Sequence, residues 1–179
     1  MLFGTESFEF EILKGIQSFF GCSFMDLIMP KVSSIGNMGY IWIIMGFLML
    51  CLKKYRRTGI ILLTGLFLGV LIGNAFLKNV IARPRPCWIA DSFPLLIANP
   101  IDFSFPSGHT LSSFISAFVI YNGNKKLGAM AFALALLIAF SRMYLFVHFP
   151  TDILAGIILA FAITRLMFLA ADKTFHSRV

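Results

Sequence analysis

LGAMAFALALLIAFSRMYLFVHFPTD, residues 127–152, joins a long apolar run to a compact polar cluster. The apolar part, Leu127 to Phe146, has about the 20 residues that a helix needs to cross a bilayer. Arg142, His148 and Asp152 gather at its end. Ionisable groups at a membrane edge are costly, so they indicate a functional site by default. The stretch therefore predicts a transmembrane helix with chemistry at one membrane face.

The composition extends this interpretation to the whole chain. Of the 179 residues, 59% are hydrophobic and 13% are charged, against roughly 25% charged residues in ordinary soluble domains. A soluble protein of this size could not hide so much apolar surface, so lipid must be the solvent for much of it. We expect one membrane-embedded domain over residues 1–179, with no separate soluble module.

Further apolar runs predict an all-α bundle of five transmembrane helices. The predicted spans are Gly36–Leu52, Thr58–Leu77, Ser107–Tyr121, Leu127–Phe146 and Ile153–Leu169. The third span is short and rich in serine, and small hydroxyl side chains let helices pack closely inside a bundle.

Residues 1–35 predict an interfacial region rather than a clear span. Ile12, Ile16, Phe19 and Phe20 recur at helical spacing with polar residues between them, which is typical of an amphipathic helix lying at the membrane surface. A sixth span within these residues stays open.

The net charge of +7 falls in short clusters between the apolar runs. These clusters are Lys53–Arg57, Lys125-Lys126 and the tail with Lys173 and Arg178, and their spacing fits the positive-inside rule. If they are cytosolic, the five spans alternate consistently and residues 81–105 lie outside. Nucleic-acid binding is not expected, because no polar stretch interleaves basic and aromatic residues.

Several single residues carry weaker expectations. Three cysteines cannot all pair within the chain; a Cys22–Cys87 disulfide stays open, as does the oligomeric state. Arg83 is expected either to reach toward lipid headgroups or to serve the site, and the sequence leaves both interpretations open. Asp26, Asp91 and Asp102 are expected to be loop or capping residues.

The polar clusters on the predicted outer side meet the demands of phosphate binding. A phosphate ester needs several cations, and Lys78, Arg85 and Arg142 can supply them. Pro106 stands where a helix would begin, so Ser107 to His109 would present free backbone N–H groups to an anion.

The same clusters hold the groups that phosphoryl transfer requires. Asp152 follows His148 by four residues, so its carboxylate can hold one ring nitrogen and leave the other free to attack. His109 is a second histidine in these clusters. Two histidines without supporting carboxylates or thiolates make a poor zinc site, so we expect neither a metal nor a cofactor.

These motifs together resemble the three-part signature of the type-2 phosphatidic acid phosphatase family. The signature covers residues 78–152 as Lys78-x6-Arg85-Pro86, Pro106-Ser107-Gly108-His109 and Ser141-Arg142-x5-His148-x3-Asp152. The resemblance implies a helical bundle, metal-independent hydrolysis and a site that faces away from the cytosol. It implies His148 as nucleophile, Asp152 as its orienting partner and His109 as general acid. The phosphate-binding residues would be Lys78, Arg85, Ser107, Gly108 and Arg142.

The expected function is therefore hydrolysis of a lipid phosphate or diphosphate in a bacterial cytoplasmic membrane, through a phosphohistidine. Undecaprenyl diphosphate is the first expected substrate, and phosphatidylglycerophosphate and phosphatidic acid are alternatives. Phosphotransfer to another acceptor is a rival with the same chemistry. A transporter of phosphate-bearing solutes is a rival of a different class, but its charges would follow the membrane depth rather than gather at one side. Soluble vanadate haloperoxidases share the signature, and the hydropathy argues against that branch.

Overall fold

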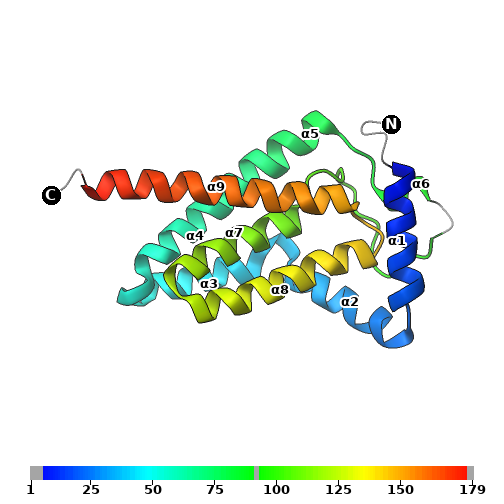
Figure 1. Cartoon of the computed structure of the whole chain (residues 1–179), viewed down its shortest axis with the longest axis horizontal. Coiled ribbons are helices and arrows are strands. Elements are labelled where there is room, and N and C mark those ends of the chain that lie inside the picture. Colours follow the sequence, from blue (N-terminus) through cyan, green and yellow to red (C-terminus); the bar gives the residue numbers. More distant parts are fainter. Residues whose placement is uncertain (1–5, 91–92, 177–179) are drawn as a thin grey trace.

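The computed structural model describes residues 6–90 and 93–176, and every regular element in these ranges is a helix (Figure 1). The long helices are α1 (Glu6–Phe20), α2 (Ser23–Ile35), α3 (Tyr40–Cys51), α4 (Arg56–Gly69), α7 (Gly108–Gly123), α8 (Lys125–Tyr144) and α9 (Pro150–His176). The short ones are η1 (Asn37–Gly39), η2 (Lys53–Tyr55), η3 (Val70–Leu77), α5 (Lys78–Ile81) and α6 (Pro86–Ile89). The expected all-α class is confirmed.

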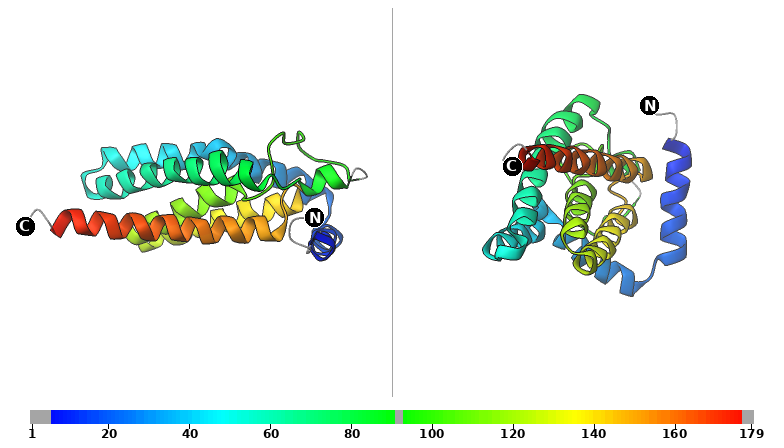
Figure 2. Two further views of the ribbon diagram at one scale, coloured as in Figure 1. Left: turned by 90° about the horizontal axis from the view of Figure 1, so that it is seen from above. Right: turned by 60° about the vertical axis from the view of Figure 1, so that its left-hand side comes forward.

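Helix α7 is the centre of the bundle. It packs against α8, α9 and α4, and more weakly against α3, and these helices run roughly side by side along the long axis (Figures 1 and 2). Three of its four serines and threonines, Thr110, Ser113 and Ser116, are fully buried. Trp42 Nε1 of α3 donates to Ser113 Oγ at 3.1 Å. The serine-rich composition therefore serves close helix packing, as expected.

The outer surface of the bundle is apolar. Large side chains that face outward include Ile44 and Phe47 on α3, Met130 and Leu136 on α8, and Ile158 on α9. Such a surface is stable only where hydrocarbon surrounds it. Among the described residues, four helical stretches are long and apolar enough to cross a membrane: Ser23–Cys51, Lys53–Ile89, Lys125–Tyr144 and Pro150–Ala171.

The number of spans stays a prediction. Helix α7, the counterpart of the predicted third span, has only 16 residues, fewer than the roughly 20 that a spanning helix usually has. The predicted span Gly36–Leu52 corresponds to η1 and α3, and α2 precedes them across a kink at Met38 and Gly39, both of which have positive φ.

The N-terminal helix α1 lies across one end of the bundle, nearly perpendicular to α8 and α9 (Figure 1). Its packed face is centred on Glu9 and Leu13, with exposures of 2% and 0%. The amphipathic face that the sequence predicts for the membrane surface holds Ile12, Ile16, Phe19 and Phe20. Phe19 is 82% exposed and Phe20 42% exposed, and the interfacial position of α1 stays a prediction. The inward row follows the i, i+4 spacing from Glu9, which a pattern of apolar residues alone cannot identify.

The two ends of the bundle differ in character. The turns that hold Lys53–Arg57 and Lys125-Lys126 lie at the end opposite α1 (Figure 1). The starts of α7 and α9 and the end of α8 lie at the α1 end. All three cysteines are free thiols, and Cys87 is buried whereas Cys22 is exposed, so the Cys22–Cys87 pair is not formed.

Close packing at the α7–α8 hairpin generates a test of the fold. A Cβ at Gly128 would lie 2.1 Å from the Cα of Tyr121, which is backbone and cannot rotate away. We expect Gly128→Ala to destabilise the protein by about 1–3 kcal/mol, the usual cost of overpacking, and to lower its Tm in detergent. Gly15→Ala is the matched control, because nothing lies within 4 Å of that position. Equal Tm values for the two variants would contradict this packing.

Candidate active site

A polar cavity of about 520 Å³ opens at the α1 end of the bundle. Residues from α2, η1, the segment 97–102 and the start of α7 form its walls. Its charged and titratable lining residues are Lys78, Arg85, Asp102, His109, Arg142 and His148. Five of these six were predicted site residues, and the five come from the three separate parts of the signature.

Three cations face one carboxylate in this cavity. Arg85 donates to Asp102 twice, from Nη2 to Oδ1 at 2.7 Å and from Nε to the backbone oxygen at 2.7 Å. Lys78 Nζ pairs with the other carboxylate oxygen. Partial burial by itself would raise the pKa of Asp102, but its hydrogen bond to Lys78 and the charges of Lys78 and Arg85 outweigh burial and hold that pKa well below its usual range.

Arg142 is the third cation. It is 4% exposed, and its Nη1 donates to Ser33 Oγ of α2. Its Nε has no hydrogen-bond partner among the described residues. A buried donor without an acceptor is costly, so this nitrogen is suited to a ligand oxygen.

His148 lies at the bottom of the cavity with its two ring nitrogens in different surroundings. Nε2 is 3.1 Å from Arg85 Nη1. A guanidinium has only donors, so Nε2 must be the unprotonated nitrogen and Nδ1 must carry the proton. Nδ1 lies 3.5 Å from Asp152 Oδ2 and 3.4 Å from Ser104 Oγ, and both oxygens can accept a hydrogen bond from the Nδ1–H group.

The protonation state of His148 follows from its environment. Burial, followed by the charges of Arg85, Arg142 and Lys78, holds the pKa of His148 well below its usual range. The imidazole is therefore neutral near pH 7, and its Nε2 lone pair accepts from Arg85 Nη1, which also lines the cavity. This is the state that a nucleophile requires.

The start of α7 forms another wall of the cavity. Ser107 Oγ caps the helix, accepting from Thr110 N at 3.4 Å and from Thr110 Oγ1 at 3.0 Å. A Cβ on Gly108 would lie 2.8 Å from Asn74 Oδ1, so a larger residue would displace the Asn74 side chain. His109 Nε2 contacts Asn37 Oδ1 at 3.0 Å.

The structure brings together most of the predicted site residues. Lys78, Arg85, Gly108, His109, Arg142 and His148 line the cavity, and Asp152 lies directly behind His148. Ser107 is the exception, since it is fully buried, it is not among the lining residues, and its backbone N–H donates to the Asp152 carbonyl at 3.2 Å. The backbone N–H of Ser107, which we expected to be free for an anion, therefore already has an acceptor.

Several functional contacts were missed from sequence. Asp102 does more than the predicted loop or capping residue, because it holds two of the cations. Arg83 does not reach toward headgroups: it is 1% exposed, and Nη1 donates to Asp152 Oδ1 at 2.8 Å. Ser104 also donates to Asp152. The only sequence signal was position, since Arg83 lies between Lys78 and Arg85 and Asp102 lies shortly before Pro106. Asp91 lies outside the described residues.

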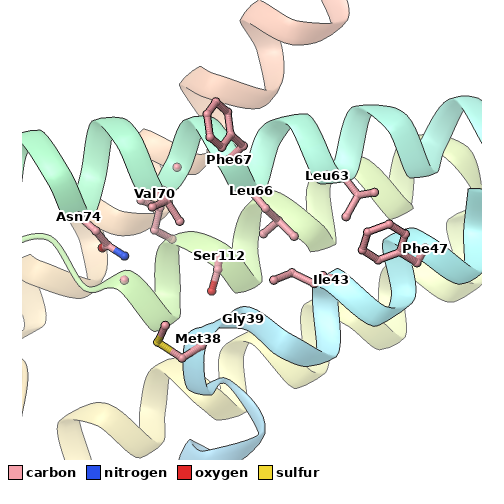
Figure 3. A pocket seen from close by; sticks show the side chains of 13 residues that line it. Met38, Gly39, Ile43, Phe47, Leu63, Leu66, Phe67, Val70, Asn74 and Ser112 are labelled. Atoms are coloured by element: carbon pink, nitrogen blue, oxygen red, sulfur yellow. The ribbon is translucent and has the colours of Figure 1, made fainter.

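An apolar groove of about 340 Å³ adjoins the polar cavity (Figure 3). It runs between α3 and the α4–η3 helix, from Asn74 and Met38 toward Phe47 and Leu63. Both hollows share Met38 and Gly108 as lining residues. The site thus combines a cationic end with an apolar extension that follows the helices. Among the described residues, no group of three or more His, Cys, Asp or Glu side chains could hold a metal ion.

The pairing of Asp102 with two cations predicts competition with anions. We expect Asp102→Asn to tighten the binding of inorganic phosphate by about tenfold, or about 1.4 kcal/mol, because the carboxylate occupies the groups that an anion needs. Calorimetric titration of the purified protein with phosphate would measure this. Glu11→Gln, which removes a carboxylate whose side chain is 70% exposed, is the control. Weaker phosphate binding by Asp102→Asn would show that Asp102 organises the cations instead of competing.

Comparison with known proteins identifies the family of this chain. Undecaprenyl-diphosphatase from Sulfolobus acidocaldarius is 33% identical over 65% of this chain, and the matched segment spans only 57% of that relative. Undecaprenyl-diphosphatase BcrC from Bacillus subtilis is 28% identical over 92% of this chain and 84% of its own. The crystal structure of a transmembrane PAP2-type phosphatidylglycerolphosphate phosphatase from Bacillus subtilis superposes with a TM-score of 0.77 at 25% identity, covering 96% of this chain and 88% of that one. Residues 58–175 match the model of the PAP2 superfamily, and the chain therefore belongs to that superfamily.

Proposed function

We propose that this chain is a membrane lipid phosphatase that hydrolyses a lipid phosphate or diphosphate through a phosphohistidine on His148. One observation carries the proposal. The unprotonated Nε2 of a neutral His148 faces a cavity with three cations, while Asp152 holds the protonated Nδ1 from behind. Family membership and the names of the relatives support the same activity.

In the first step, the Nε2 lone pair attacks phosphorus and the bond to the leaving oxygen breaks. Burial and the charges of Arg142, Lys78 and Arg85 lower the pKa of His109 to about 3, so His109 takes up its proton as the substrate phosphate neutralises these cations. It then transfers this proton to the leaving oxygen, which becomes the alcohol of the lipid or, for a diphosphate, a lipid monophosphate. Asp152 stabilises the positive charge that develops on the imidazole. Lys78, Arg85 and Arg142 bind the phosphoryl oxygens, and Arg85 exchanges its contact with Nε2 for one of these oxygens.

In the second step, water attacks phosphorus and gives its proton to His109, which now acts as a base. The phosphorus–nitrogen bond breaks, its electron pair returns to Nε2, and inorganic phosphate leaves. The amides of Gly108 and His109 at the start of α7 are further donors for the phosphoryl group. Ser107, which the sequence predicted to bind phosphate, would instead support this helix start through its cap on Thr110.

The apolar groove supports a lipid as substrate. Its walls include Ile43, Phe47, Leu66 and Val70, and Phe47 and Val70 are more than half exposed on the outer face of the bundle. A hydrocarbon chain lying there would remain in contact with the bilayer while its phosphate entered the cationic cavity (Figure 3). A soluble phosphate ester would have no use for such an extension.

The preferred substrate is undecaprenyl diphosphate, which would yield undecaprenyl phosphate. Two relatives whose names specify this activity support that choice. Phosphatidylglycerophosphate is the second candidate, because the superposed Bacillus subtilis structure is named for that substrate.

The proposed location is the bacterial cytoplasmic membrane, with the site on the extracytoplasmic side. The basic turns at Lys53–Arg57 and Lys125-Lys126 lie at the end of the bundle opposite the cavity. Basic loops favour the cytosolic side, which leaves the cavity on the other face. The same separation argues against a transporter, since the cations gather at one end.

Phosphate release by purified protein tests the proposal. We expect turnover of undecaprenyl diphosphate above phosphatidylglycerophosphate, phosphatidic acid and a soluble ester, and we expect it to persist in excess chelator. His148→Ala should lower kcat by at least about 1,000-fold without changing the elution profile of the folded protein. His176→Ala, at the third histidine, is the control. Full turnover by His148→Ala would refute the mechanism, and transfer of phosphate to a lipid acceptor would identify a phosphotransferase.

The groove has a test of its own. We expect Val70→Trp to raise KM for the lipid substrate by about five- to tenfold, because the indole narrows the groove, and to leave kcat/KM for a soluble ester unchanged. Leu136→Trp on α8 is matched in exposure, 58% against 53%, and lies outside the groove. An equal rise in KM for both variants would remove the groove from substrate binding.

A further inference from the structure

A second buried polar cluster lies behind the catalytic cavity. Arg83 is at its centre, 1% exposed, and it is not among the lining residues of the cavity. Its Nη1 donates to Asp152 Oδ1 at 2.8 Å and to Thr151 Oγ1 at 2.7 Å. The guanidinium also lies over the ring of Phe149, 4.1 Å from the centroid. Arg83 therefore contacts Asp152 from the side opposite His148.

The cluster is completed by a residue of the N-terminal helix. Glu9 of α1 is 2% exposed, and its Oε2 accepts from Arg83 Nη2 at 2.6 Å. Its Oε1 accepts from the backbone N of Thr151 at 3.0 Å and from Thr151 Oγ1 at 2.6 Å. Helix α1 precedes the segment that matches the superfamily. The carboxylate of Glu9, which lies outside that segment, thus contacts Arg83 and Thr151 beside Asp152.

The two carboxylate oxygens of Asp152 have different partners. Oδ1 accepts from Arg83, whereas Oδ2 accepts from Phe149 N at 2.8 Å and from Ser104 Oγ and lies toward His148 Nδ1. The carboxylate is therefore held in one plane from both sides. A buried charge needs a partner, and Glu9 gives Arg83 a second carboxylate beside that of Asp152.

We propose that Glu9 and Arg83 are positioning residues for His148. Glu9 orients the guanidinium of Arg83, Arg83 fixes the carboxylate of Asp152, and Asp152 keeps the proton of His148 on Nδ1, so that Nε2 faces the phosphate cavity. This inference rests on the proposed role of His148 as nucleophile. The proposal assigns α1 a role in the active site, because Glu9 belongs to that helix.

The test compares three variants of the full chain in detergent: Glu9→Gln, Arg83→Lys and the control Glu11→Gln. Glu11 lies on the same helix, exposed and paired with Lys14 at 2.9 Å. We expect Glu9→Gln to lower kcat by about 10- to 100-fold, the usual effect of losing an outer partner. KM for the lipid and the inhibition constant of orthovanadate should change less than twofold, because neither Glu9 nor Arg83 lines the cavity.

Arg83→Lys should lower kcat further, since one ammonium cannot reproduce the planar fork that serves Asp152, Thr151 and Glu9. Glu11→Gln should match the wild type. If Glu9→Gln lowers only Tm and keeps the wild-type kcat per vanadate-titrated site, the cluster is merely structural and the proposal fails. A rise in the vanadate constant that parallels the loss of kcat would also overturn it, because it would place the cluster in phosphate binding.

A readout without turnover separates this proposal from the proposed function. The chain has three histidines, so the ring nitrogens of ¹⁵N-histidine-labelled protein are few enough to assign with a His148→Gln sample. We expect Glu9→Gln and Arg83→Lys to shift the proton of His148 from Nδ1 toward Nε2, and Glu11→Gln to leave it in place. An unchanged tautomer overturns the positioning role even if the enzyme is active. A shifted tautomer supports it even if no lipid phosphate is hydrolysed.

Should Glu9→Gln fail to fold, Thr151→Val replaces it. This change keeps every charge and nearly the same shape, but it removes the hydroxyl that donates to Glu9 and accepts from Arg83. We expect a several-fold loss of kcat with the same shift of the His148 tautomer. Wild-type values for both would contradict the proposal.

Discussion

The fixed carboxylate of Asp152 is the constraint on which the site depends. Its side chain accepts from Arg83, Ser104 and the Phe149 amide, and its backbone oxygen accepts from the Ser107 amide. These contacts join the start of α9 to three other segments, including the start of α7. A buried carboxylate is tolerated only when its oxygens are satisfied, so these segments can meet in few other ways. The position of His148, four residues earlier, follows from that junction.

Lipid as solvent explains why the polar groups are so unevenly distributed. Hydrocarbon gives helices no hydrophobic reason to associate, so close packing of small side chains has to hold them together. Gly128 against Tyr121 and the buried serines of α7 provide that packing. The charged side chains are then free to gather at the two ends, the basic turns at one end and the cavity at the other. The bundle separates the site from the basic turns by the length of its helices.

The site has a cationic part and an apolar part, which match a molecule with a phosphate group and a hydrocarbon chain. The cationic cavity and the apolar groove meet at Met38 and Gly108, where the kink after α2 adjoins the start of α7. The absence of a side chain at Gly108 lets Asn74 of η3 approach closely. Helix η3 is a π-helix, a form often found at functional positions, and its Asn74 adjoins Gly108, where the two hollows join. The same few residues therefore shape the entry of the phosphate and the path of the hydrocarbon.

The sequence by itself determined the helical class, the lipid environment and five of the six charged and titratable residues that line the cavity. Apolar runs of spanning length admit few alternatives, and the ionisable groups between them stand out against that background. It did not determine the number of spans, since α7 has only 16 residues, packs against several neighbouring helices and carries a weak hydropathy signal. The packed face of α1 and the partners of Asp102 and Arg83 were decided only by the tertiary structure. Each depends on contacts between segments far apart in the chain, such as Glu9 with Arg83 and Thr151, and local spacing carries no information about such distances.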